Sequence, residues 1–130
     1  MKTKLFFFLL FTAALNASAQ SGYQDLNVQE FQSKMTATPG AMPLDVRTPD
    51  EIAKGIIPSA KQLDYFKKDF ESEVAKLDKS KTYFLYCAAG GRSSETAELM
   101  TRLGFKNIYN LKDGFEAWKK AKMPIEQVKK

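Results

Sequence analysis

The sequence contains no histidine and only one cysteine among its 130 residues. The lack of histidine excludes Ser-His-Asp and Cys-His catalysis and argues against a zinc site. A single cysteine cannot form a disulfide within the chain, so Cys87 is an unpaired thiol. A buried, inert cysteine is the usual interpretation of such a residue. Whether it applies here depends on the residues around Cys87.

Long hydrophobic runs are also scarce, since no later segment approaches the roughly 20 apolar residues of a membrane span. One shorter run, Leu5 to Leu15, lies at the amino terminus, behind Lys2 and Lys4 and ahead of Ala17-Ser18-Ala19. A basic start, a short apolar run and a small-x-small site are typical of a secretory signal peptide. We therefore expect residues 1–19 to be a signal peptide and the protein to be periplasmic or secreted. An uncleaved anchor or a buried amino-terminal helix is the alternative.

The sequence has no long uninterrupted run of charges of one sign. The 20 basic and 15 acidic residues give a net charge of +5, or +3 without residues 1–19. The basic residues are scattered or lie near the carboxyl terminus, which indicates a solvated face and tail rather than a nucleic-acid patch. Residues 20–130 are enough for one compact domain with its own core. We expect a monomer that binds no nucleic acid.

Strand-like and helix-like segments alternate along this domain. Asn27 and Thr48 are candidate N-caps, Glu51 completes a capping box, and Gly104 suits a left-handed helix end. This alternation predicts an α/β fold with a mostly parallel sheet. The expected strands are 42–46, 59–63, 82–86 and 107–111; the expected helices begin at 27 and 48 and include 66–77, 94–103 and 114–120.

One predicted helix rests on apolar spacing alone. Phe66, Phe70, Val74 and Leu77 recur at helical intervals, which predicts a long amphipathic helix. We expect Phe66 and Phe70, together with Trp118, to pack in the core.

The surroundings of Cys87 favour a reactive thiol. Thr82–Tyr86 has the composition of a buried strand, and Ser94–Leu103 has a helical apolar face. A cysteine between a strand end and a helix start lies where backbone N–H groups and the helix dipole meet. That environment stabilises the thiolate, which is the nucleophile. We expect an exposed thiol of low pKa that is prone to oxidation.

The loop that follows the cysteine has the features of an anion site. Curvature at Gly90 and Gly91 would turn consecutive amides inward around the sulfur. Arg92 offers a planar charge that can hold an oxyanion by two hydrogen bonds. We assign Cys87 as the catalytic residue. The expected substrate-binding residues follow it directly: Ala88, Ala89, Gly90, Gly91, Arg92 and Ser93.

Three segments in this order and spacing resemble the rhodanese-like sulfurtransferases over nearly all of residues 24–126. They are Leu44–Glu51 continuing to Gly55–Ala60, then Cys87–Ser93, and last Leu111–Phe115 with Trp118 and Pro124. The resemblance implies a central, mostly parallel five-stranded sheet with helices on both faces. It also implies that Cys87 takes a sulfane sulfur from thiosulfate, a polysulfide or a persulfide. The Cys87 persulfide then passes it to cyanide, a low-molecular-weight thiol or a protein acceptor, with no metal or organic cofactor.

Two departures from the family pattern are Ile56, where a histidine is usual, and Asp113-Gly114, where two glycines are usual. Both positions look structural. The loop also has Arg92 as its only basic residue, so we expect thiosulfate to be a poor donor.

Alternative interpretations remain at this point. Asp45, Arg47 and Glu51 could be a catalytic acid, an anchor and a base, but a structural network at the strand end is the stronger interpretation. A Cys-dependent phosphatase or arsenate reductase is a weaker alternative, because such loops have five residues between Cys and Arg and this loop has four. A carrier or protein-binding module that holds a persulfide without turnover is the third.

Overall fold

The computed structural model describes residues 22–129, so the predicted signal peptide lies outside the described residues. The described chain forms five strands: β1 (Gln24–Leu26), β2 (Met42–Asp45), β3 (Lys61–Gln62), β4 (Tyr83–Tyr86) and β5 (Ile108–Leu111). They make one sheet in the order β1-β5-β4-β2-β3, and every neighbouring pair is parallel. The predicted α/β fold with a five-stranded parallel sheet is confirmed.

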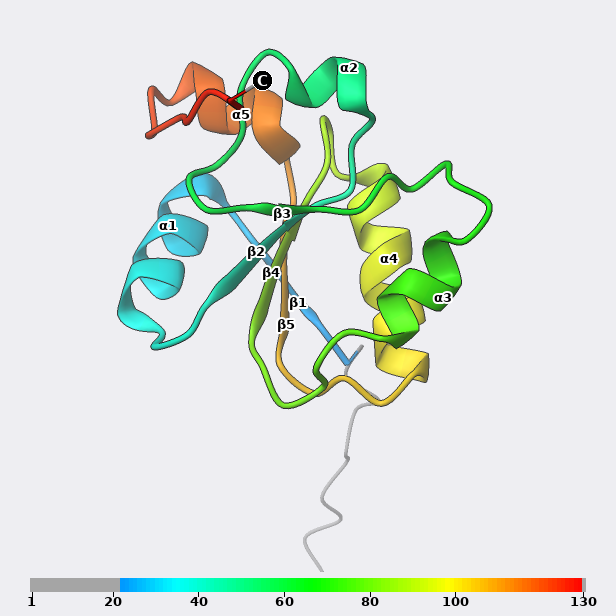
Figure 1. Cartoon of the computed structure of the whole chain (residues 1–130). Helices are drawn as coiled ribbons and strands as arrows, with labels where there is room; N and C mark the ends of the chain where they lie inside the picture. Colours follow the sequence, from blue (N-terminus) through cyan, green and yellow to red (C-terminus); the bar gives the residue numbers. More distant parts are fainter. Residues whose placement is uncertain (1–21, 130) are drawn as a thin grey trace, which may run out of the picture.

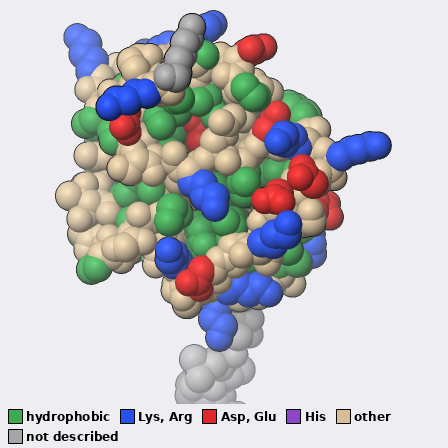
Figure 2. All heavy atoms as spheres, in the orientation of Figure 1, with side chains coloured by type: hydrophobic (Ala, Val, Ile, Leu, Met, Phe, Trp, Pro, Cys, Tyr) green, Lys and Arg blue, Asp and Glu red, His purple; other side chains and the backbone are tan. Residues whose placement is uncertain are grey.

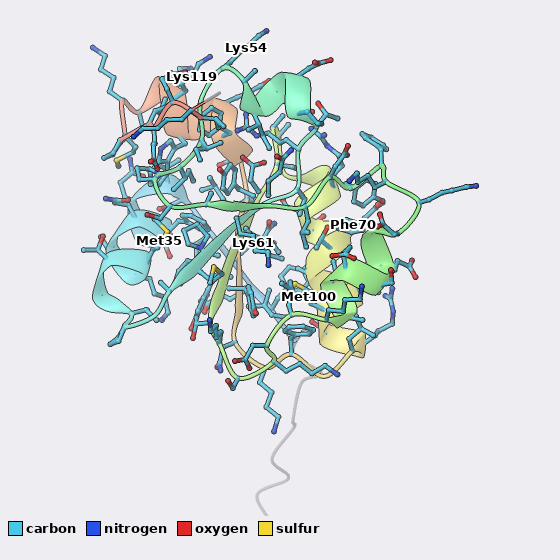
Figure 3. All side chains as sticks on the ribbon, viewed as in Figure 1. Met35, Lys54, Lys61, Phe70, Met100 and Lys119 are labelled. Carbon is cyan, nitrogen blue, oxygen red and sulfur yellow. The ribbon has the colours of Figure 1, made fainter. Side chains whose placement is uncertain are left out.

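Helices cover both faces of this sheet (Figure 1). They are α1 (Val28–Ala37), α2 (Pro49–Ile52), α3 (Phe70–Ala75), α4 (Gly91–Arg102) and α5 (Gly114–Lys120). Side chains alternate across β4, so Leu85 packs with α3 and α4 while Phe84 packs with α1 and α5. Figure 3 shows Met35 of α1 and Met100 of α4 on opposite sides of the sheet. The parallel sheet is thus buried on both faces, as this arrangement requires.

The helix ends follow the local sequence. The Asn27 side chain accepts a hydrogen bond from the Glu30 amide at 2.9 Å. Thr48 and Glu51 form a reciprocal capping box at the start of α2. Gly104 has a φ of 93°, and the following amide, that of Phe105, donates to the Met100 carbonyl at 3.0 Å. These predicted caps are confirmed.

The predicted helix over 66–77 is wrong in its first part. α3 begins only at Phe70, and Phe66 is 68% exposed. The Asp64 side chain accepts from the Phe66 amide at 3.0 Å, which fixes a turn in place of a first helical turn. Phe70 and Trp118 are buried as predicted. Phe66 is therefore a surface residue.

Because all strands are parallel, their carboxyl ends meet at one edge of the sheet. Figure 1 shows the loop after β4, the short helix α2 and the start of α5 together at this edge, at the top of the view. On the face that carries β3, acidic and basic side chains are interspersed (Figure 2). No helix within residues 22–129 combines the length and apolarity that crossing a membrane requires.

Candidate active site

Cys87 lies immediately after β4, and three donors surround its sulfur. The Gly90 amide donates to Sγ at 3.1 Å, and the Ser93 amide and hydroxyl each lie 3.4 Å from it. The loop therefore folds around the side chain of the residue that begins it. This is the inward-facing arrangement of amides that an anion needs.

The balance of burial and hydrogen bonding sets the ionisation of Cys87. Burial raises the pKa of the thiol, but hydrogen bonds from the Ser93 hydroxyl and from the amides of Ser93, Gly90 and Ala89 lower it by more. The net result is a pKa below the usual value of a cysteine. The thiolate is thus favoured by several donors that act on one atom.

The expected exposure of the thiol is wrong, since Cys87 is only 2% exposed. The sulfur lies beneath its own loop, in which Ala88 is half-buried and Ala89 is exposed. The loop amides that lower its pKa are also the atoms that cover it. A reactant must therefore be small, or must displace this loop slightly, to reach the sulfur.

The first turn of α5 holds the outer side of the loop. The amides of Phe115 and Glu116 donate to the carbonyls of Cys87 and Ala88 at 2.8 and 3.1 Å. These bonds direct the carbonyls away from the sulfur and leave the amide groups facing it. The predicted helix over 114–120 is confirmed, but the sequence did not indicate that its amides support the loop.

Gly114 permits this close approach between α5 and the loop. Its φ is 73°, and a Cβ atom there would lie 2.2 Å from the Ala88 carbonyl oxygen. No other residue type fits that space without moving the loop. Gly114, the second residue of the Asp113-Gly114 pair, therefore has a structural role. Its contact with the loop could not be predicted from the sequence.

The two glycines of the loop have different roles. Gly90 has a φ of 105°, and a Cβ atom there would lie 2.1 Å from the Lys112 carbonyl oxygen. Gly91 is the first residue of α4, and a Cβ there would meet nothing within 4 Å. The curvature thus depends on Gly90, and the prediction that Gly91 shares this role is wrong.

Arg92 lies beside the loop with its charge already paired. Its two terminal nitrogens donate to the two carboxylate oxygens of Glu51 at 2.7 and 2.8 Å. The exposed ring of Phe66 lies 5.6 Å from the guanidinium carbon. Hydrogen bonding to Arg92 is the main reason that the pKa of Glu51 falls to about 2, against the opposing effect of burial.

Asp45 and Arg47 form a separate buried pair at the end of β2. Arg47 donates to both carboxylate oxygens of Asp45 at 2.8 to 3.2 Å and to the Gly55 carbonyl at 2.8 Å. Its guanidinium also lies 4.0 Å from the Phe115 ring. This arrangement holds the strand end against the segment before β3 and against α5. Glu51 makes its hydrogen bonds with Arg92 instead of joining this pair.

The remaining predicted positions are peripheral. Ile56 forms an isolated bridge with Glu126 near the carboxyl end of the chain. Among residues 22–129, no group of three or more Cys, Asp or Glu side chains is placed to hold a metal ion.

Comparison with known proteins places this site in context. Residues 27–121 match the family described as the rhodanese-like domain. A sulfurtransferase of Allochromatium vinosum is 28% identical over 101 residues, which are 78% of this chain and 92% of the relative. Thiosulfate sulfurtransferase GlpE of Coxiella burnetii is 39% identical over 75 residues, which are 58% of this chain and 68% of the relative. A rhodanese-related protein from Thermoplasma volcanium has the same fold, with a TM-score of 0.72 at 24% identity over 82% of this chain and 100% of that chain.

Proposed function

Because the chain belongs to the rhodanese-like domain family, we propose that it is a sulfurtransferase in which Cys87 carries the transferred sulfur as a persulfide. The observation that carries this proposal is the set of three donors within 3.4 Å of the Cys87 sulfur. They stabilise an anion on that atom and need no metal ion or histidine.

The reaction proceeds in two displacements. The Cys87 thiolate attacks the terminal sulfur of a donor such as thiosulfate. The S–S bond of the donor breaks, its electron pair leaves with sulfite, and Cys87 becomes a persulfide anion. Cyanide or a thiolate then attacks the outer sulfur, and the electron pair of the Cys87 S–S bond returns to Cys87. Both steps conserve charge and use no external oxidant.

The loop serves both states of the cysteine. The amides of Gly90 and Ser93 stabilise the thiolate before the first step. After the first step, the loop 88–93 surrounds the outer sulfur of the persulfide, because the persulfide extends the Cys87 side chain by one sulfur toward the loop surface. The methyl groups of Ala88 and Ala89 add little bulk to this surface, so they leave room for the extra atom.

The proposal extends to the setting of the reaction. The amino-terminal segment supports export to the periplasm or outside the cell, where the acceptor is a low-molecular-weight thiol, cyanide or a protein thiol. The protein acts as a monomer without a cofactor, membrane span or nucleic acid.

The decisive experiment is intact-mass measurement after incubation with thiosulfate, a polysulfide or glutathione persulfide. Cys87 is the only cysteine, so any stable sulfur gain is assigned without ambiguity. We expect a gain of one sulfur atom that is lost on addition of cyanide, with thiocyanate released in equal amount. Cys87→Ser should show neither change. A Cys87→Ser protein that still produced thiocyanate would contradict the assignment. A protein that gained sulfur but released none to any acceptor would be a carrier without turnover.

A further inference from the structure

The guanidinium of Arg92 is the only side-chain cation of the loop, and its outer edge is occupied. Both terminal nitrogens donate to Glu51, one to each carboxylate oxygen, at 2.7 and 2.8 Å. This two-point geometry is the one by which arginine binds an oxyanion such as the sulfonate end of thiosulfate. Glu51 thus takes the place that a dianionic donor would use.

Glu51 is held in that place from its own side as well. Its Oε1 atom accepts from the Thr48 amide at 3.3 Å and from the Thr48 hydroxyl at 3.1 Å, as part of the capping box of α2. The side chains of Arg92 and Glu51 are only 20% and 32% exposed. Moving the Glu51 carboxylate aside would break its hydrogen bonds to Thr48 at the start of α2 and to Arg92 at the start of α4.

Within residues 22–129, no second arginine near the loop compensates for this pairing. Arg47 is engaged by Asp45 and by the Gly55 carbonyl. An anionic donor that approaches Cys87 therefore meets a thiolate, a fixed carboxylate and a guanidinium whose two terminal nitrogens are already engaged by Glu51. Repulsion between like charges disfavours a doubly charged ion more than a neutral or singly charged donor.

We propose that Glu51 sets donor specificity by occupying the guanidinium edge of Arg92, so that Cys87 takes sulfur from hydropersulfides in preference to thiosulfate. The proposal rests on the sulfurtransferase function given above. With a hydropersulfide, R–S–SH, the Cys87 thiolate attacks the terminal sulfur and the S–S bond breaks. The electron pair leaves with R–S⁻, and Cys87 becomes a neutral hydropersulfide. This step brings no additional negative charge to the site.

The test compares two donors in the wild-type chain, Glu51→Gln and Asp50→Asn. Glutamine at position 51 can still complete the capping box, so α2 is retained while the negative charge is removed. Asp50 is an exposed acid in the same helical turn and controls for the general loss of one charge. Initial rates are measured over a range of thiosulfate and of glutathione persulfide concentrations, with cyanide as the acceptor.

We expect Glu51→Gln to raise kcat/KM for thiosulfate about tenfold, mainly through a lower KM, as one charge-assisted contact becomes available. The value for glutathione persulfide should change less than about twofold, and Asp50→Asn should alter neither donor. The Glu51→Gln/Arg92→Gln double variant should lose the gain with thiosulfate, because the gain acts through the freed guanidinium. That loss also separates the effect from any general loosening of α2.

The possible outcomes separate the role of Glu51 from the sulfurtransferase function itself. An unchanged donor preference in Glu51→Gln, an equal change in Asp50→Asn, or a gain that persists in the double variant would overturn the role of Glu51 and leave the sulfurtransferase function intact. A wild-type chain that formed no persulfide with either donor would overturn the function itself, and this inference with it.

Discussion

Ser93 provides the most direct test of how the loop controls the thiol. Its amide and its hydroxyl are two of the three donors that lie within 3.4 Å of the Cys87 sulfur. The hydroxyl also lies 3.3 Å from the Gly90 carbonyl, and with a single proton it can donate to only one of the two acceptors at a time. Ser93→Ala removes the hydroxyl and keeps the amide, so it isolates one contribution to the pKa.

The expected size of the effect follows from these distances. A hydrogen bond to a charged group is worth about 1.5–3 kcal/mol. The Ser93 hydroxyl loses part of this because it gives up the Gly90 carbonyl in order to donate to the thiolate. A net loss of about 1.4 kcal/mol corresponds to about a tenfold change in an ionisation equilibrium. Ser93→Ala should therefore raise the pKa of Cys87 and reduce the thiolate fraction below that pKa about tenfold.

The reaction rates should then cross as the pH rises. Nucleophilicity increases with pKa with a Brønsted slope of about 0.5, so the variant thiolate should be about threefold more reactive. Below both pKa values, the tenfold smaller thiolate fraction leaves the variant about threefold slower. Above both values it should be about threefold faster. Single-turnover persulfide formation measured across a pH series, with the ultraviolet absorbance of the thiolate recorded alongside, gives both the pKa and the rate.

Ser94→Ala is the matched control. Ser94 is the next residue of α4, and its hydroxyl donates to the Gly91 carbonyl at 3.0 Å. Its removal should leave the pKa of Cys87 unchanged. Parallel pH profiles that never cross, or an equal shift in the Ser94 variant, would refute the reasoning, because the Ser93 effect would then be one of geometry and not of ionisation.

Three further predictions concern stability. Gly114→Ala should lower the free energy of unfolding by at least about 2 kcal/mol and slow persulfide formation, because the new methyl group would meet the Ala88 carbonyl. Gly91→Ala, where nothing lies within 4 Å, should leave stability equal or higher by up to about 1 kcal/mol, and urea denaturation that showed equal losses would contradict this assignment. The low pKa of Glu51, about 2 against an ordinary 4.5, stabilises the fold above pH 4.5, and this contribution is lost as the pH falls through about 2. The Glu51 side chain is 32% exposed, so solvent screening reduces this contribution to about 1 kcal/mol. As the pH is lowered through this range, the urea midpoint of Glu51→Gln should therefore fall less than that of the wild-type chain. An equal fall in the two proteins would argue against the ion pair.

Most of the fold could be predicted from the sequence, because helix ends and buried strands are determined largely by residues that are neighbours in the chain. Asn27 and Thr48 cap helices through their side chains, and Gly104 ends a helix because it can adopt a positive φ. β1 was not predicted, because only Leu26 of its three residues is buried. It is an edge strand that exists through pairing with β5, about 85 residues away along the chain.

The parts of the site that sequence could not supply are contacts across long separations. Glu51 and Arg92 are 41 residues apart, and the capping box explains Glu51 without any reference to Arg92. Phe66 matches the period of α3, yet a local bond from its amide to Asp64 ends that pattern. The burial of Cys87 depends on how the loop closes, which the number of glycines alone did not reveal.

The bonds from the Phe115 and Glu116 amides to the Cys87 and Ala88 carbonyls have a consequence for the proposed sulfur transfer. They clamp the peptide planes before any donor arrives, so the entropy lost in ordering the ring is lost once, when the protein folds, and not in each cycle. Little backbone reorganisation is then needed as charge moves from one sulfur to the next. Helix α5, which contributes no reacting atom, thereby helps to set the rate of the proposed reaction at the end of β4.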